Sequence, residues 1–149
     1  MALNSMNRFE LQPATVGDVP YLDILVDGKP LATYFAGRLG SPPGEVSPLG
    51  WSSALEEYKQ DQFRRFLVEA PSDLPNGRNS ILVCQVCGDL ACGAYSAVFR
   101  RKGDVIQWSE FAYESTLDFE GAEIPVPIRL PEFIFSWEQY QRELIQYLI

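Results

Sequence analysis

Three cysteines give this sequence its clearest chemical signal. Cys84, Cys87 and Cys92 lie in the stretch Cys-Gln-Val-Cys-Gly-Asp-Leu-Ala-Cys. Two thiolates two residues apart can share one tetrahedral zinc ion, and Cys-x-x-Cys-Gly has the spacing of a zinc knuckle. The chain has no histidine and no second Cys-x-x-Cys, so Asp89, another carboxylate or water would be the fourth ligand. Free cysteines are commonly buried. We therefore expect no metal here, with zinc as the alternative.

The absence of histidine also limits the catalytic chemistry. It removes Ser-His and Cys-His pairs and the commonest general base. Paired carboxylates remain possible as an acid–base pair: Glu110 with Glu114, or Asp118 with Glu120. Such work needs one carboxyl group whose pKa is raised by burial, whereas this stretch is strongly polar. We therefore expect a protein that is not an enzyme and has no catalytic residue; the alternative is a small metal-binding or enzymatic domain that uses the turn of Cys84, Cys87 and Cys92.

The negative charge is concentrated in the last third of the chain. Residues 104–149 carry nine acidic side chains and two arginines, a net charge of −7 out of −8 for the whole chain. Phosphate-rich partners such as nucleic acids would be repelled by this part of the molecule. A basic protein partner would be attracted to it.

Aromatic residues alternate with the acids between Ser109 and Glu123. Rings supply contact area in protein interfaces and charges supply steering. The alternative is a solvated loop whose rings pack inward. The predicted partner-binding residues are Glu110, Phe111, Tyr113, Glu114, Asp118, Phe119 and Glu120.

The strands that would carry these residues are indicated by short apolar runs and by turns. Three β-like runs separated by glycines lie between Ile81 and Phe111, and short turns predict that they pair antiparallel. A hairpin is predicted at Asp27-Gly28, between strands Tyr21–Val26 and Leu31–Phe35. Phe9–Leu11 is expected to be a short strand ended by Pro13. Gly37–Gly50 is expected to be a long loop, one that could be a binding loop.

Two helices are predicted. The first begins at Ser52 or Ser53, where Ser53 and Glu56 have capping-box spacing, and ends at Pro71. Its apolar stripe comprises Leu55, Tyr58, Phe63, Phe66 and Leu67. The second is capped by Ser136 with Gln139, and Phe135 and Tyr140 have the spacing of a hydrophobic staple. Its buried stripe comprises Trp137, Tyr140, Leu144 and Leu148.

Length and composition predict one α+β domain over residues 1–149, with an antiparallel sheet and two helices packed on it. The apolar runs are too short to span a bilayer, so we expect no membrane partner. The first residues lack the apolar region of a signal peptide, and the cysteine count is odd. The expected location is the cytoplasm.

Four motifs in this order resemble a family of small, poorly characterised bacterial proteins. They are Val26–Leu31, Cys87–Cys92 in a Cys-Gly-(Asp/Glu)-x-x-(Gly/Ala)-Cys turn, Trp-Ser-Glu-Phe at Trp108–Phe111, and Phe135–Tyr140. The resemblance brings no catalytic residue. Small acidic bacterial proteins of this kind resemble toxin-immunity proteins. The resemblance therefore implies a protein that neutralises a cognate toxin by binding to it and occluding it.

Overall fold

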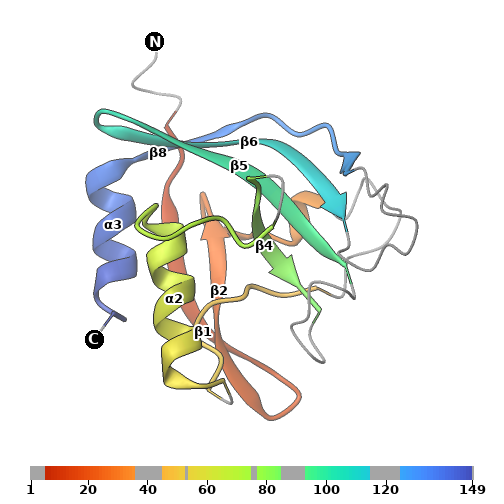
Figure 1. Ribbon diagram of the computed structural model, residues 1–149, viewed down its shortest axis with the longest axis vertical. Coiled ribbons are helices and arrows are strands. Elements are labelled where there is room, and N and C mark those ends of the chain that lie inside the picture. The colour runs from red at the N-terminus through yellow and green to blue at the C-terminus, as the bar shows by residue number, and fades with distance from the viewer. Residues whose placement is uncertain are drawn as a thin grey trace.

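The computed structural model describes residues 6–35, 45–52, 54–74, 77–84, 93–114 and 125–148. It confirms the α+β class: antiparallel strands with helices packed against them (Figure 1). The strands form two sheets, one of three strands in the order β1-β2-β3 and one of five. In the larger sheet the order is β4-β5-β6-β7, and β8 also pairs with β6. None of the helices described is long and apolar enough to cross a membrane.

The smaller sheet consists of β1 (Phe9–Val16), β2 (Val19–Val26) and β3 (Lys29–Pro30). Along β2 the apolar residues alternate as predicted, with one face buried. The prediction that Pro13 ends β1 is wrong, because Pro13 lies within the strand opposite Leu22. β1 is an edge strand, where a residue without an N–H group is tolerated.

The predicted Asp27-Gly28 turn is confirmed, with φ values of 55° and 81° that match a tight primed turn. The predicted return strand Leu31–Phe35 is wrong. β3 contains Lys29 and Pro30 alone, and the Leu31 N–H makes one more bond to β2, to the Ile24 carbonyl at 2.8 Å. The chain then turns, because the Tyr34 N–H donates to the Leu31 carbonyl at 3.0 Å. This turn allows Leu31 and Phe35, which lie four residues apart, both to be buried.

The larger sheet contains the three central runs predicted from the sequence. They are β4 (Asn79–Val83), β5 (Ala94–Lys102) and β6 (Val105–Glu114). The short strands β7 (Val126–Pro127) and β8 (Phe133–Ser136) both pair with β6. The β5–β6 hairpin turns between Lys102 and Val105 as expected.

Two links join the sheets around one core. Asn7, just before β1, forms a parallel bridge with Phe135 in β8. The described end of the Gly37–Gly50 segment makes the other link, because Val46 pairs with Val83 and the Leu49 carbonyl accepts from Leu22 at 3.0 Å. Residues 37–44 of that predicted loop lie outside the described residues.

The helix α2 (Glu56–Phe66) begins later than predicted. Its N-cap is Leu55, which makes no side-chain cap hydrogen bond, and Ser53 lies outside the described residues. Phe63, Phe66 and Leu67 are buried as expected, but the N-terminal part of the predicted stripe is not: Leu55 is 80% exposed and Tyr58 is also exposed. The first turn of α2 extends beyond the core, so periodicity alone overestimated the buried stripe.

The C-terminus of α2 is closed by a Schellman motif rather than by Pro71. The Val68 N–H donates to the Arg65 carbonyl at 3.0 Å, and the Glu69 N–H donates to the Arg64 carbonyl at 2.8 Å. Val68 has a φ of 60°, in the left-handed region that glycine usually occupies at this position. The helix therefore ends at Phe66, five residues before the proline.

The helix α3 (Trp137–Ile145) confirms its predicted cap and staple. The Ser136 hydroxyl accepts from the Gln139 N–H at 3.4 Å, and the Phe135 and Tyr140 rings stack at 5.5 Å. Tyr140 and Leu144 are buried, whereas Trp137 and Leu148 are only half-buried. α3 also closes the free edge of β1, because two of its side chains accept from backbone N–H groups there: Gln139 from Phe9 and Glu143 from Leu11.

Trp108, on β6, lies at the centre of the core. Its side chain is fully buried, as predicted, and its ring contacts rings from both sheets and both helices. The contacting rings belong to Phe9, Phe66, Phe99, Phe135 and Tyr140.

Candidate functional site

The candidate site lies at an irregularity in β6. Ser96 pairs with Ala112, and Val98 pairs with Ser109. Glu110 and Phe111 therefore lie opposite one residue of β5, the residue between Ser96 and Val98. This extra residue in β6 is a β-bulge. Glu110 has a φ of 54°, a left-handed conformation that costs an L-residue roughly 1–2 kcal/mol. Such strained positions are concentrated at binding and catalytic sites.

A buried polar cluster holds the bulge in this conformation. One terminal nitrogen of Arg78 donates to the Glu110 carbonyl. Arg78 Nε lies 3.0 Å from both Ser96 Oγ and Glu114 Oε2, and Ser96 Oγ donates to Glu114 Oε2 at 2.5 Å. The cluster joins β5, β6 and the residue before β4. Sequence patterns did not predict this cluster, because Arg78 and Ser96 belong to no motif.

This cluster corrects the prediction for Glu114. The residue was expected to contribute an exposed charge, but its side chain is 4% exposed and is paired with Arg78. At the strand end where Glu114 pairs with Ala94, its side chain lies against Ser96 rather than in solvent. A partner protein cannot reach it while the sheet is intact.

Phe111 is corrected in the same way. Its ring is 2% exposed and contacts the rings of Phe35 and Phe133 at 6.1 and 5.2 Å. The bulge shifts the alternation of β6 so that Phe111 joins Trp108 on the core face. For this ring the alternative reading, packing inward, is the correct one.

Two of the predicted contact residues remain at the surface. The Glu110 side chain is 59% exposed and lies 3.2 Å from Arg100, which is itself well exposed. Tyr113 is half-buried, with its ring 5.1 Å from that of Tyr95. A Cβ atom on Gly93 would lie 2.0 Å from the Tyr113 hydroxyl, so only glycine permits this ring position. Asp118, Phe119 and Glu120 lie outside the described residues.

Tyr95 is the residue of β5 that pairs with Tyr113, and both rings lie on the core side of the sheet. The pKa of Tyr95 is raised to about 12, mainly by burial, with smaller contributions in the same direction from the nearby Glu45 carboxylate and from Tyr113. Its hydroxyl therefore stays protonated at neutral pH. This tyrosine supports the position of Tyr113 and carries no charge of its own.

A pocket of about 370 Å³ opens beside the bulge. Arg78 and Glu110 supply its charged groups, and prolines with one isoleucine form most of the opposite wall. This wall is fixed to β6, because Pro127 pairs with Ala112 and the Ile128 N–H donates to the Phe111 carbonyl at 2.8 Å. The lining residues are Arg78, Glu110, Phe111, Ala112, Pro125, Pro127 and Ile128. The pocket can receive one side chain whose stem is apolar and whose end group carries a charge.

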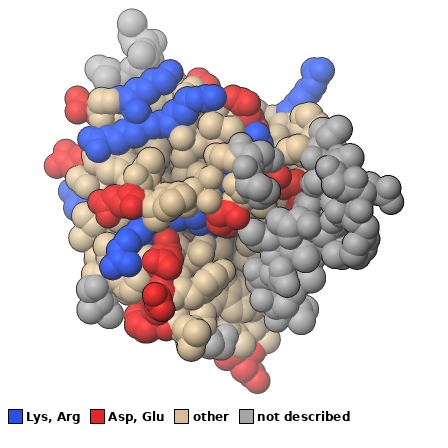
Figure 2. Space-filling model, in the orientation of Figure 1, with Lys and Arg blue, Asp and Glu red and all other residues tan. Residues whose placement is uncertain are grey.

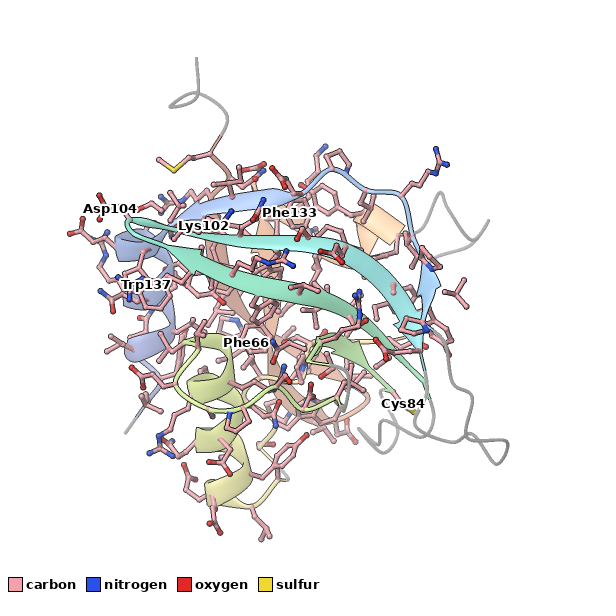
Figure 3. All side chains as sticks on the ribbon, turned by 45° about the horizontal axis from the view of Figure 1, so that its top comes forward. Phe66, Cys84, Lys102, Asp104, Phe133 and Trp137 are labelled. Atoms are coloured by element: carbon pink, nitrogen blue, oxygen red, sulfur yellow. The ribbon has the colours of Figure 1, made fainter. Side chains whose placement is uncertain are left out.

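The carboxylate and cysteine hypotheses can be placed on the same structure. Glu110 and Glu114 do not face each other as a catalytic pair would, because each has its own arginine. Cys84 is half-buried after β4, at the far end of the sheet from Lys102 and Asp104 (Figure 3). Cys87 and Cys92 lie outside the described residues, so the geometry of the zinc alternative is not defined. Within the described ranges no group of three potential metal ligands occurs.

The acidic charge of residues 104–149 is less available than the sequence implied. Glu114 is buried with Arg78, and Glu143 accepts from the Leu11 N–H at 2.9 Å. On the face shown in Figure 2, acidic and basic side chains are interspersed, with Lys and Arg gathered towards its upper part. Glu110 therefore stands out as an acidic group of this stretch that combines exposure with a neighbouring pocket.

Comparison with known protein families, curated proteins and solved structures finds no match for this chain.

Proposed function

We propose that this protein is a non-enzymatic binding protein of the immunity type, acting in the cytoplasm. It neutralises a cognate bacterial toxin by binding a basic surface of the toxin and occluding it. The observation that carries the proposal is Glu110: an exposed carboxylate, on a strained bulge, at the edge of a pocket.

The strain supports a role in binding rather than in stability. A glycine at this position would adopt the left-handed conformation without the cost paid by Glu110. The chain instead has a charged side chain there. Arg78 donates to the Glu110 carbonyl and is itself held by Ser96 and Glu114. Binding groups that are pre-organised need supporting hydrogen bonds of this kind, which hold an exposed charged group in one position.

Binding would begin with long-range attraction and end with one anchored side chain. The net charge of −8 increases the rate at which a basic partner encounters the molecule. An arginine or lysine of the toxin then replaces Arg100 as the partner of Glu110, while its aliphatic stem lies against Pro125, Pro127 and Ile128.

Co-expression tests the proposal. The toxin candidate is the product of the gene next to the one that encodes this chain, and the readout is growth of cells that express it. The wild-type chain should restore growth and purify in a stoichiometric complex with the toxin domain. Glu110→Arg should abolish protection, whereas Glu69→Arg, an equal charge change at another exposed position, should leave it intact. No complex, or full protection by Glu110→Arg, would refute the proposal.

A further inference from the structure

A second pocket, of about 340 Å³, lies between the β1–β2 hairpin and α2. It shares no lining residue with the pocket beside Glu110. The hairpin contributes one wall and α2 the other, and Tyr147, after α3, is also part of the lining. The lining residues are Pro13, Pro20, Tyr21, Leu22, Gly50, Glu56, Lys59, Gln60, Phe63 and Tyr147.

Half of the residues that line this pocket carry a ring. The Phe63 and Tyr147 rings stack at 6.1 Å with an interplanar angle of 16°. Tyr21 stacks on Trp51 at 5.7 Å, which fixes its ring from behind. The hairpin adds the two proline rings, both exposed. Grooves lined by aromatic rings are the surfaces that bind extended proline-rich segments, since these segments are already ordered before binding.

At Gly50 the backbone that lines the pocket packs closely against the Leu22 side chain. Gly50 has a φ of 72°, and a Cβ atom there would lie 2.7 Å from Leu22 Cγ. Any side chain at position 50 would displace Leu22. The depth of the pocket on this side therefore depends on glycine.

A positioned carboxylate marks one side of the pocket. Glu56 Oε1 lies 3.4 Å from Lys59 Nζ, and Glu56 Oε2 accepts from Gln60 Nε2 at 3.3 Å. All three residues line the pocket. The Glu56 side chain is 63% exposed and that of Lys59 only 24%, so the carboxylate is the more accessible charge of the pair. Together with the net charge of −8, this favours a basic group on the ligand.

We propose that this pocket binds an extended, proline-containing peptide segment of a partner protein, with a lysine or arginine of that segment paired to Glu56. The proline rings lie against Tyr21, Phe63 and Tyr147. The tyrosine hydroxyls are suited to donate to the ligand carbonyls, which have no partner within a polyproline II helix. The site is independent of Glu110, so loss of toxin binding and loss of peptide binding are separate outcomes.

The test is selection from a phage library of random twelve-residue peptides against the purified full chain. Enriched clones should share prolines and at least one lysine or arginine. The enriched peptide is then synthesised and titrated while amide chemical shifts are followed, and the shifts should be confined to residues around the pocket.

Paired variants identify the charge contact. Glu56→Lys should weaken binding of the selected peptide roughly tenfold, or about 1.4 kcal/mol, since the reversal replaces an attraction by a repulsion. Glu57→Lys is the matched control, because it lies in the same first turn of α2 and is exposed but does not line the pocket. It should change the affinity less than about twofold. Tyr147→Ser should also weaken binding while the melting temperature shows a folded protein.

Three results would overturn the proposal. One is a library that yields no enriched clone. Another is enriched peptides that lack proline or carry only acidic residues. The third is equal loss of affinity in Glu56→Lys and Glu57→Lys, which would show a general charge effect rather than a contact in the pocket.

Discussion

Replacing Glu114 by glutamine should destabilise the protein far more than the same change at Glu110, four residues earlier. Both residues belong to one acidic stretch, and both have an arginine partner. They differ in burial: the Glu114 side chain is 4% exposed and accepts hydrogen bonds from Ser96 and Arg78, whereas that of Glu110 is 59% exposed.

The magnitudes follow from burial. Removing one charge of a buried pair leaves the other charge uncompensated and costs roughly 3–5 kcal/mol. Glutamine keeps the shape of Glu114 and one acceptor oxygen, so we expect the lower end, about 3 kcal/mol. An exposed pair such as Glu110 with Arg100 contributes at most about 1 kcal/mol. With a urea m-value of about 2 kcal/mol/M, the midpoints should fall by about 1.5 M for Glu114→Gln and by less than about 0.5 M for Glu110→Gln.

A double-mutant cycle separates the pair from its surroundings. Arg78→Met removes the second charge of the buried pair while keeping much of the side-chain stem. The double variant Glu114→Gln with Arg78→Met should be more stable than the sum of the single effects by more than about 1 kcal/mol. Additive free energies would contradict the pairing of Glu114 with Arg78. Similar urea midpoints for Glu114→Gln and Glu110→Gln would contradict the burial of Glu114.

Three further outcomes test the packing. Val68→Gly should be about 1 kcal/mol more stable than Val68→Ala in urea melts, because glycine accepts the left-handed conformation that Val68 adopts at the end of α2; equal stabilities would contradict the Schellman motif. Trp108→Ala should lower the free energy of unfolding by roughly 3–5 kcal/mol, since it removes the fully buried centre of the aromatic core, and an unchanged denaturation midpoint would disprove that position. The pKa of Tyr95 is raised to about 12, so the folded state holds this proton more tightly than the unfolded state. Its contribution to stability is complete below about pH 10 and is lost as the pH rises to about 12; Tyr95→Phe should lose less stability over that range, and identical pH profiles would contradict the shift.

Local patterns in the sequence predicted much of the fold. The central strands, the β2–β3 and β5–β6 turns and the staple of α3 all depend on residues a few positions apart, where spacing and turn chemistry decide the structure. The errors occurred where distant parts of the chain decide. Leu55 and Tyr58 follow the helical period of α2, yet the core does not extend far enough to cover them.

The candidate site shows the same division. The alternation of acidic residues and rings predicted an exposed charge at Glu110, and its side chain is exposed. The alternation could not distinguish Glu110 from Glu114, because the partner that buries Glu114 is Arg78, 36 residues away. The bulge that turns Phe111 inward depends on the register between β5 and β6, which no local pattern specifies.

The most direct test of the proposed function is the association rate of the toxin candidate with three versions of this chain, measured at low and at physiological salt. Wild-type association should slow as salt rises, since the Debye length falls to about 8 Å at physiological ionic strength. Glu110→Gln should associate several-fold more slowly than wild type at low salt. Glu69→Gln, with the same loss of one exposed charge, should match wild type. Equal rates for Glu110→Gln and Glu69→Gln would contradict the claim that the bulge of β6 is the binding surface.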